Sequence, residues 1–187
     1  GPVVRAGLAF VLFSLLSGCV YLLNDLMDLD SDRAHPVKRN RPLASGRLAV
    51  RDGKRALGVL LLATGGGAFL LSTEFAAIAL SYFVLNVGYS FSLKNIPFVD
   101  VLIIASGFIL RLFAGAVAID VPLSVWLMGC TFLLAAFLAL GKRRHELEVV
   151  GTDNASTRPV LARYSATGIQ WTMGALAVAT SACYGAY

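Results

Sequence analysis

Six long apolar stretches dominate this 187-residue sequence and limit what it can fold into. They cover residues 3–23, 56–73, 76–92, 98–118, 122–140 and 168–187. A helix that crosses the hydrocarbon core of a bilayer needs about 20 predominantly apolar residues. None of the stretches shows the strict alternation of a barrel strand. Because only helices and closed barrels satisfy their backbone groups inside lipid, the sequence predicts an all-α, polytopic transmembrane helical bundle with six spanning helices.

The composition excludes an ordinary water-soluble domain. Hydrophobic residues make up 57% of the sequence and charged residues only 14%, whereas a soluble domain carries about 25% charged residues. The chain is also too apolar for intrinsic disorder. Its three cysteines, Cys19, Cys130 and Cys183, all lie in apolar stretches. They predict packed thiols without a disulfide framework, and no Cys/His cluster suggests a zinc site.

The distribution of positive charge predicts the topology. Of the 16 Lys and Arg residues, all except Arg5 and Arg111 lie in three polar segments, residues 24–55, 93–97 and 141–167. Threading six helices in order places these segments on one side, while the opposite connections carry only Glu74 and Asp120. The positive-inside rule makes the basic side cytoplasmic. We therefore expect an integral protein of the cell (inner) membrane whose active site faces the cytoplasm.

The two ends of the sequence lie in or beside apolar stretches, and the first residue is Gly. We expect residues 1–187 to form a single transmembrane catalytic domain that is truncated at both ends.

The first apolar stretch ends in an acidic motif, N-D-x-x-D-x-x-x-D, formed by Asn24, Asp25, Asp28 and Asp32. If the helix continues through it, the three aspartates lie within about 60° of one another, because each residue advances 100°. Carboxylates on one stripe repel each other, and a divalent cation removes that repulsion. Oxygen ligands of this kind suit Mg²⁺, Ca²⁺ or Mn²⁺.

Among these cations the sequence favours Mg²⁺. An EF-hand loop beginning at Asp28 would need Gly and Glu where the sequence has Arg33 and Arg39. Mg²⁺ typically takes one or two carboxylates together with substrate phosphate oxygens. We predict a Mg²⁺ site with Asn24, Asp25, Asp28 and Asp32 as ligands, and the three aspartates as catalytic residues.

A basic segment, residues 33–43, follows the acidic motif directly. We predict that Lys38, Arg39 and Arg41 bind phosphate, because Arg offers a planar fork of donors and Lys a mobile point charge. Pro36 and Pro42 favour an ordered turn. The alternative is a solvated loop that touches anionic lipid head groups.

Polar residues in the third apolar stretch and after it provide further candidates. Tyr82, Asn86 and Tyr89 share one helical face, and Lys94 follows at the cytoplasmic end. We expect Tyr89 and Lys94 to bind substrate, whereas Tyr82 and Asn86 are equally consistent with interhelical hydrogen bonds.

Charged residues in and after the fourth and fifth stretches extend this set. Arg111 shares a face with Asp100 and either contacts a substrate phosphate or pairs with a buried acid. Lys142 and Arg143 are candidate phosphate contacts, and Glu146 is a candidate metal ligand. The alternative for these last three is a salt-bridged interfacial helix.

At these residues the sequence resembles the UbiA superfamily of intramembrane prenyltransferases. The acidic motif is similar to that superfamily's first aspartate motif. Tyr89 and Lys94 are similar to its Tyr/Lys pair, although the spacing is one residue longer than in many aromatic prenyltransferases. The likeness is strongest to a branch that transfers phosphoribose, over residues 32–42, 100–115, 141–147 and 164–167. GKRRHEL, residues 141–147, stands where prenyltransferases usually have a second D-x-x-x-D.

The resemblance implies a nine-helix fold, of which this chain would hold the second to the seventh helix. It implies Mg²⁺-dependent transfer of 5-phosphoribose from phosphoribosyl diphosphate to polyprenyl phosphate, with release of diphosphate, in cell-wall precursor synthesis. Lys38, Arg39, Arg41 and Lys94 would share the charge of the leaving group. Lys142 and Arg143 would seat the ribose 5-phosphate or the lipid phosphate.

Two other functions remain open at the level of sequence. One is a UbiA-type transfer of a polyprenyl group from its diphosphate to an aromatic acceptor. In that reaction the metal would bind the diphosphate leaving group in the same way. The other is a membrane transporter, although the internal repeats typical of that class are absent from the sequence. The expected partners are the two anionic substrates and membrane lipids, without nucleic acid, and a homo-oligomer is compatible with the sequence.

Overall fold

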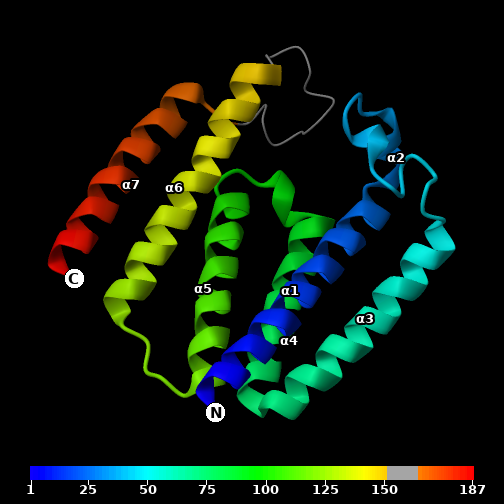
Figure 1. Ribbon diagram of the computed structural model, residues 1–187. Helices are drawn as coiled ribbons and strands as arrows, with labels where there is room; N and C mark the ends of the chain where they lie inside the picture. The colour runs from blue at the N-terminus through cyan, green and yellow to red at the C-terminus, as the bar shows by residue number, and fades with distance from the viewer. Residues whose placement is uncertain (151–163) are drawn as a thin grey trace. The chain divides into compact units, whose positions relative to one another are not determined.

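A computed structural model describes residues 1–150 and 164–187, except for the side chains of residues 149 and 150 (Figure 1). Within these ranges all regular structure is helical and no strand is present. The long helices are α1 (Pro2–Met27), α3 (Val50–Leu71), α4 (Thr73–Phe91), α5 (Val99–Ile119), α6 (Val125–Val150) and α7 (Ala166–Ala186). Short helices are α2 (Leu29–Ala34), η1 (Lys38–Asn40) and η2 (Leu93–Asn95). The prediction of an all-α transmembrane bundle is confirmed.

Five of the six expected spans, α1, α3, α4, α5 and α6, are long and apolar enough to cross a membrane. The sixth expected span forms α7 but is not among these five. Helix α7 contains no charged residue, but Gln170 and several Thr, Ser and Gly residues lower its mean hydropathy.

The chain divides into two compact units. The first contains residues 1–91 with 114–120, and the second contains residues 92–113 with 121–187.

In the first unit, α1, α3 and α4 pack against one another. The ring of Phe13 on α1 lies edge-on to Phe75 and 4.9 Å from the ring centroid of Tyr82, both on α4. The buried Tyr82 hydroxyl also shares a 3.3 Å hydrogen bond with Ser17 of α1. Of the two interpretations of Tyr82, the structure therefore supports interhelical hydrogen bonding.

Helices α1 and α3 approach closely at Gly67. A Cβ atom on Gly67 would lie 2.6 Å from Cδ2 of Leu12. This contact leaves no room for a larger residue unless Leu12 moves. Small residues such as Gly67 allow the backbones of membrane helices to approach closely.

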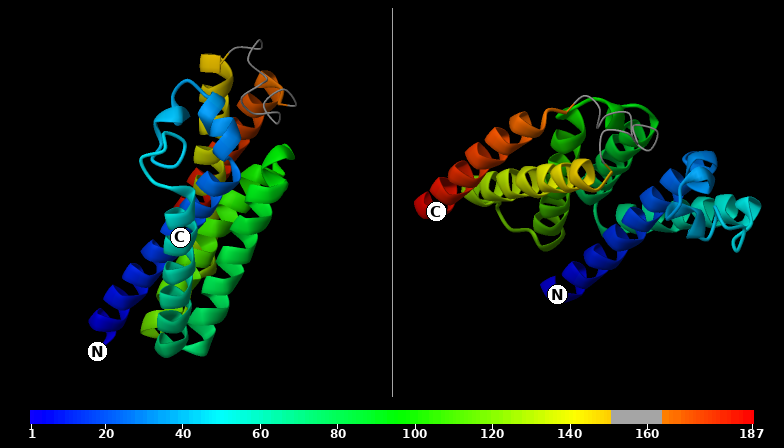
Figure 2. Two further views of the ribbon diagram at one scale, coloured as in Figure 1. Left: turned by 90° about the vertical axis from the view of Figure 1, so that its right-hand side faces the viewer. Right: turned by 90° about the horizontal axis from the view of Figure 1, so that it is seen from above.

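In the second unit, α6 lies alongside α7 (Figures 1 and 2). The buried core includes Val101 and Ala105 of α5, Ala136 and Leu140 of α6, and Ile169 of α7. Alanine is prominent on the buried face of α6, which permits close helix contact in place of interlocked large side chains.

Candidate active site

The acidic motif lies at the junction of α1 and α2. Asp28 separates the two helices, with φ −90° and ψ 11°. Its N–H still donates to the carbonyl of Asn24 at 2.9 Å, and the N–H of Asp32 donates to the carbonyl of Asp28 at 2.8 Å. One i to i+4 hydrogen bond therefore ends α1 at Asp28 and another begins α2 there. Across this junction Asp25 and Asp32 lie on one side, where both contact Arg41.

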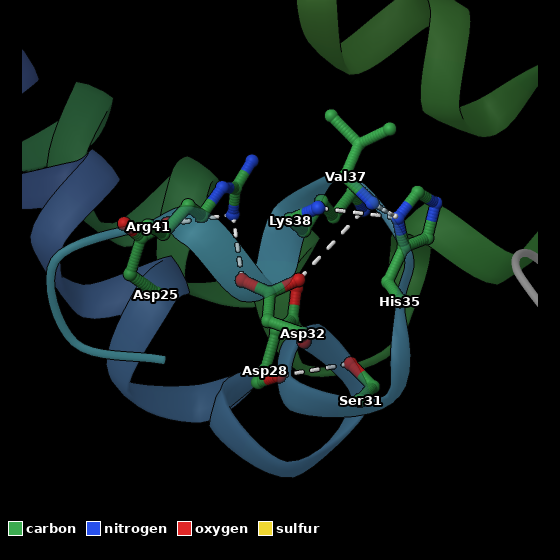
Figure 3. A network of polar contacts seen from close by, with 8 residues as sticks. All are labelled: Asp25, Asp28, Ser31, Asp32, His35, Val37, Lys38 and Arg41. Atoms are coloured by element: carbon green, nitrogen blue, oxygen red, sulfur yellow. Dashed lines mark hydrogen bonds and ion pairs between the residues drawn. The ribbon is translucent and has the colours of Figure 1, made fainter. Parts of the chain in front are cut away.

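Asp25 and Asp32 converge on a single cationic nitrogen (Figure 3). Nη1 of Arg41 donates to Oδ1 of Asp25 and to Oδ2 of Asp32, at 2.8 Å in both cases. Nζ of Lys38 lies 3.9 Å from the other oxygen of Asp32. Asp32 is only 2% exposed, and these two cations compensate its buried charge.

The basic segment folds back over the acidic motif through local hydrogen bonds. Nδ1 of His35 accepts the N–H groups of Val37 at 3.1 Å and Lys38 at 3.2 Å (Figure 3). The N–H of Arg41 then donates to the carbonyl of Lys38 at 2.9 Å. These contacts confirm the predicted ordered turn, which places Lys38 and Arg41 beside the acidic side chains.

A buried leucine anchors the end of this segment. Leu43 is 2% exposed, and a Cβ atom on Gly53 of α3 would lie 3.0 Å from its Cδ2 atom. The close fit between Leu43 and a glycine fixes the segment to the start of α3.

The remaining predicted metal ligands do not join the Asp25–Asp32 pair as a cluster. Among the residues that the structure describes, no group of three His, Cys, Asp or Glu side chains is placed to hold a metal ion. Asn24 and Asp28 are half-buried, and both contribute backbone carbonyls to the junction. The carbonyl of Asn24 accepts the N–H of Asp28, and the carbonyl of Asp28 accepts the hydroxyl of Ser31 at 2.9 Å. Two convergent carboxylates nevertheless fit the mode in which Mg²⁺ takes one or two protein carboxylates and completes its shell with phosphate oxygens and water.

The other predicted phosphate contacts are distributed over both units. Arg39 is exposed. Tyr89 is half-buried in the first unit, and Lys94 is half-buried in the second. Arg111 is exposed on α5, with its guanidinium carbon 5.1 Å from the ring centroid of Phe108. Substrate binding by these residues stays a prediction.

A buried polar network in the second unit joins the start of α5, the basic part of α6 and Tyr164, two residues before α7. Nε of Arg143 donates to Oδ2 of Asp100 at 2.7 Å, and its Nη1 donates to Glu146 at 2.6 Å. The hydroxyl of Tyr164 donates to Oδ1 of Asp100 at 2.6 Å. Asp100 is completely buried and Arg143 is 1% exposed, so each needs these partners.

Tyr164 also holds the backbone that leads into α5. Its hydroxyl oxygen accepts the N–H of Phe98 at 2.7 Å, and the two rings lie edge-to-face with centroids 5.2 Å apart. Phe98 adopts a φ of 63°, a left-handed conformation that is unfavourable for a bulky residue. Burial, followed by the hydrogen bond to Asp100, raises the pKa of Tyr164 well above its usual value. The phenol therefore remains a proton donor at physiological pH.

This network revises the expectations for α6. The sequence predicts that Arg143 contacts phosphate and that Glu146 binds metal. They instead form an ion pair with each other, and Arg143 also binds Asp100, which is the salt-bridged alternative. Lys142 is exposed beside them and stays a predicted phosphate contact. Arg143 supplies a cation that pairs with the buried Asp100.

Sequence reasoning missed the pairing of Tyr164 with Asp100. An acid at the start of an apolar helix does demand hydrogen-bond donors. Nothing in the spacing shows, however, that one donor lies 64 positions further along the chain.

Helices of membrane-spanning length and an acidic–basic cluster at the end of the first helix define a helical integral membrane protein. The model of the UbiA prenyltransferase family matches residues 2–187. The chain therefore belongs to the UbiA prenyltransferase family.

Relatives from three bacteria are named decaprenyl-phosphate phosphoribosyltransferase. The protein from Mycolicibacterium smegmatis is 35% identical and matches 97% of this chain and 57% of its own length. The protein from Mycobacterium tuberculosis is 34% identical and matches 97% of this chain and 60% of its own length. The protein from Corynebacterium glutamicum is 36% identical and matches 96% of this chain and 55% of its own length. The chain thus spans between half and two thirds of these relatives.

Solved structures show the same fold. A UbiA homolog from Archaeoglobus fulgidus bound to GPP and Mg²⁺ matches 97% of this chain and 65% of its own chain, with 20% identity and a TM-score of 0.82. The homolog bound to DMAPP and Mg²⁺ gives a TM-score of 0.77, with 20% identity and coverage of 96% and 63%.

Proposed function

We propose that the full-length protein transfers 5-phosphoribose from phosphoribosyl diphosphate to polyprenyl phosphate, with decaprenyl phosphate as the acceptor named for its relatives, and releases diphosphate. The observation that carries this proposal is the convergence of Asp25 and Asp32 beside Arg41 and Lys38. The similarity of nearly the whole chain to decaprenyl-phosphate phosphoribosyltransferases supports this choice of substrates.

The acidic and basic side chains have complementary roles in this reaction. Asp25 and Asp32, with Asp28 nearby, would hold Mg²⁺, which supplies charge neutralisation for the diphosphate leaving group. Lys38 and Arg41 bring positive charge to the same place and bind diphosphate oxygens. Both substrates are anionic where they react, so electrostatic positioning provides most of the catalysis.

The acceptor requires little activation. Its phosphate oxygen is already ionised at neutral pH and attacks C1 of the ribose as the bond from C1 to the diphosphate breaks. The chain therefore needs no strong base at the reacting carbon. Lys94 and Lys142 are proposed to bind the ribose 5-phosphate or the lipid phosphate, whereas Arg143 is proposed to hold α6 in place.

The reaction is proposed to take place at the cytoplasmic face of the cell membrane. The concentration of Lys and Arg in residues 24–55, 93–97 and 141–167 supports this orientation. It places the acidic motif on the side where a water-soluble sugar diphosphate is present.

A second candidate is transfer of a polyprenyl group from its diphosphate to an aromatic acceptor. The family's name and the GPP bound to its Archaeoglobus fulgidus homolog favour this candidate. The sequence GKRRHEL at residues 141–147, in place of a second aspartate motif, favours phosphoribosyl transfer.

The test offers the purified full-length protein both substrate pairs and measures diphosphate release with Mg²⁺ or with EDTA. We expect Mg²⁺-dependent release only with phosphoribosyl diphosphate and polyprenyl phosphate. Release only with a prenyl diphosphate and an aromatic acceptor would overturn the phosphoribosyl assignment, and release from neither pair would favour a non-enzymatic role.

A matched pair of variants tests the site. Asp25→Asn removes one of the convergent carboxylates and should lower turnover at least 100-fold. Asp30→Asn changes a neighbouring aspartate whose side chain is 98% exposed, and it should leave turnover unchanged. Equal turnover in the two variants would remove Asp25 from the site.

A further inference from the structure

Two cysteines from different helices lie in direct contact in the second unit. Sγ of Cys130 on α6 donates to Sγ of Cys183 on α7 across 3.1 Å. The Cys183 thiol lies 3.7 Å from the carbonyl oxygen of Trp126, one turn before Cys130. Both sulfur atoms are therefore placed against the same turn of α6.

The absence of a side chain at Gly129 permits this approach. A Cβ atom at that position would lie 3.3 Å from Sγ of Cys183, which is a tight contact. A disulfide has an S–S bond of about 2.05 Å, so the two sulfur atoms need to approach by only about 1 Å.

The pair lies away from the basic end of α6. Cys130 follows the first residue of α6 by five positions, and Cys183 precedes the last residue of α7 by three. The basic residues Lys142, Arg143 and Arg144 are at the other end of α6. In the proposed orientation the cysteine pair is near the outer face, where disulfides form and persist.

We propose that Cys130 and Cys183 are a redox-modification site that forms a reversible intramolecular disulfide with a disulfide-type oxidant. Cys183, the more exposed of the two, attacks one sulfur of the oxidant as a thiolate, forms a mixed disulfide and releases one thiol. The thiolate of Cys130 then attacks Sγ of Cys183 and releases the second thiol. Both cysteine protons end on the released thiols, and the oxidant gains the two electrons.

The disulfide would join α6 to α7 across a separation of 53 residues. Such a crosslink removes conformational freedom from the unfolded chain. We expect oxidation to raise the melting temperature of the protein by about 5–10 °C, and dithiothreitol to reverse the change.

The test treats the full-length protein in detergent with 2,2′-dithiodipyridine, a small apolar disulfide that releases a coloured thione. We expect release of two thiones for this pair and a peptide that links Cys130 to Cys183 in non-reducing mass spectrometry. Cys130→Ser should release one thione at Cys183 and retain a stable mixed disulfide there. Cys19, buried in the first unit, serves as an internal reference that stays out of the linked peptide.

Wild-type protein that retains the mixed disulfide on Cys183 without the linked peptide would overturn the proposal, as would a disulfide between two chains. The reaction in detergent does not depend on membrane orientation. Neither cysteine takes part in the proposed transfer, so the thiol assay and the substrate-pair assay can fail independently.

Discussion

At the scale of single residues, Arg41 is the side chain on which both ends of the acidic motif depend. One of its nitrogens makes the contacts to Asp25 and to Asp32. Charge at one position, and not the planar fork of a guanidinium, is therefore what these two carboxylates require. Lys38 supplements that charge from 3.9 Å on the other side of Asp32.

This geometry gives a prediction for two replacements of Arg41. Arg41→Gln removes the charge and should lower kcat/KM for phosphoribosyl diphosphate by about 10–100-fold, since a hydrogen bond to a charged group contributes about 1.5–3 kcal/mol. Arg41→Lys keeps a point charge and should lose less than half of that free energy. Steady-state kinetics of the full-length variants measures both, and equal losses would show that the fork itself is needed.

At the scale of helices, the buried network holds three elements together by few contacts. Arg143 of α6 binds Asp100 of α5, and Tyr164 before α7 binds the same carboxylate. Breaking a buried pair leaves an uncompensated charge, whereas an exposed pair contributes little. Two consecutive arginines on α6 allow this difference to be measured.

We expect Arg143→Met to lower the free energy of unfolding by about 3–5 kcal/mol, because Asp100 remains buried without its cation. Arg144→Met breaks the exposed pair with Glu148 and should cost about 0–1 kcal/mol. Thermal unfolding in detergent compares the two. Similar losses would mean that the Asp100 carboxylate gains another partner in the variant.

The contact between α1 and α3 provides a second prediction at this scale. Gly67→Leu should destabilise the protein by about 1–3 kcal/mol, since Leu12 occupies the space that the new side chain requires. A Cβ atom on the adjacent Gly66 would have no neighbouring atom within 4 Å, so Gly66→Leu should be nearly neutral. Unfolding measurements on both variants are the check. A neutral Gly67→Leu would show that Leu12 moves aside without cost.

At the scale of the whole molecule, the long apolar stretches were enough to predict the helices, because span length and backbone satisfaction leave few choices in lipid. The spacing of the acidic motif also predicts that Asp25 and Asp32 lie on the same side of the helix. The sequence did not show that Arg143 is buried or that Tyr164 binds Asp100. Those contacts depend on which helices become neighbours, and a local pattern contains no information of that kind.

The small number of convergent carboxylates predicts how metal binding depends on substrate. Because only Asp25 and Asp32 converge on one point among the described residues, we expect weak binding of Mn²⁺, a spectroscopic substitute for Mg²⁺, to the full-length protein alone. Phosphoribosyl diphosphate should strengthen it at least 10-fold by adding phosphate oxygens. Electron paramagnetic resonance titration measures free Mn²⁺ in both conditions. Tight binding without the diphosphate would require further protein ligands.

The short junction at Asp28 between α1 and α2 has a consequence for changes in chain length. The N–H groups of Asp28 and Asp32 form hydrogen bonds on the two sides of this junction. An inserted residue between Asp28 and Asp32 would turn Asp32 by about 100° relative to Asp25 and separate the two carboxylates. A deletion or an insertion at the junction would therefore take the two acids out of register, whereas a change of side chain there would leave their relative rotation unchanged.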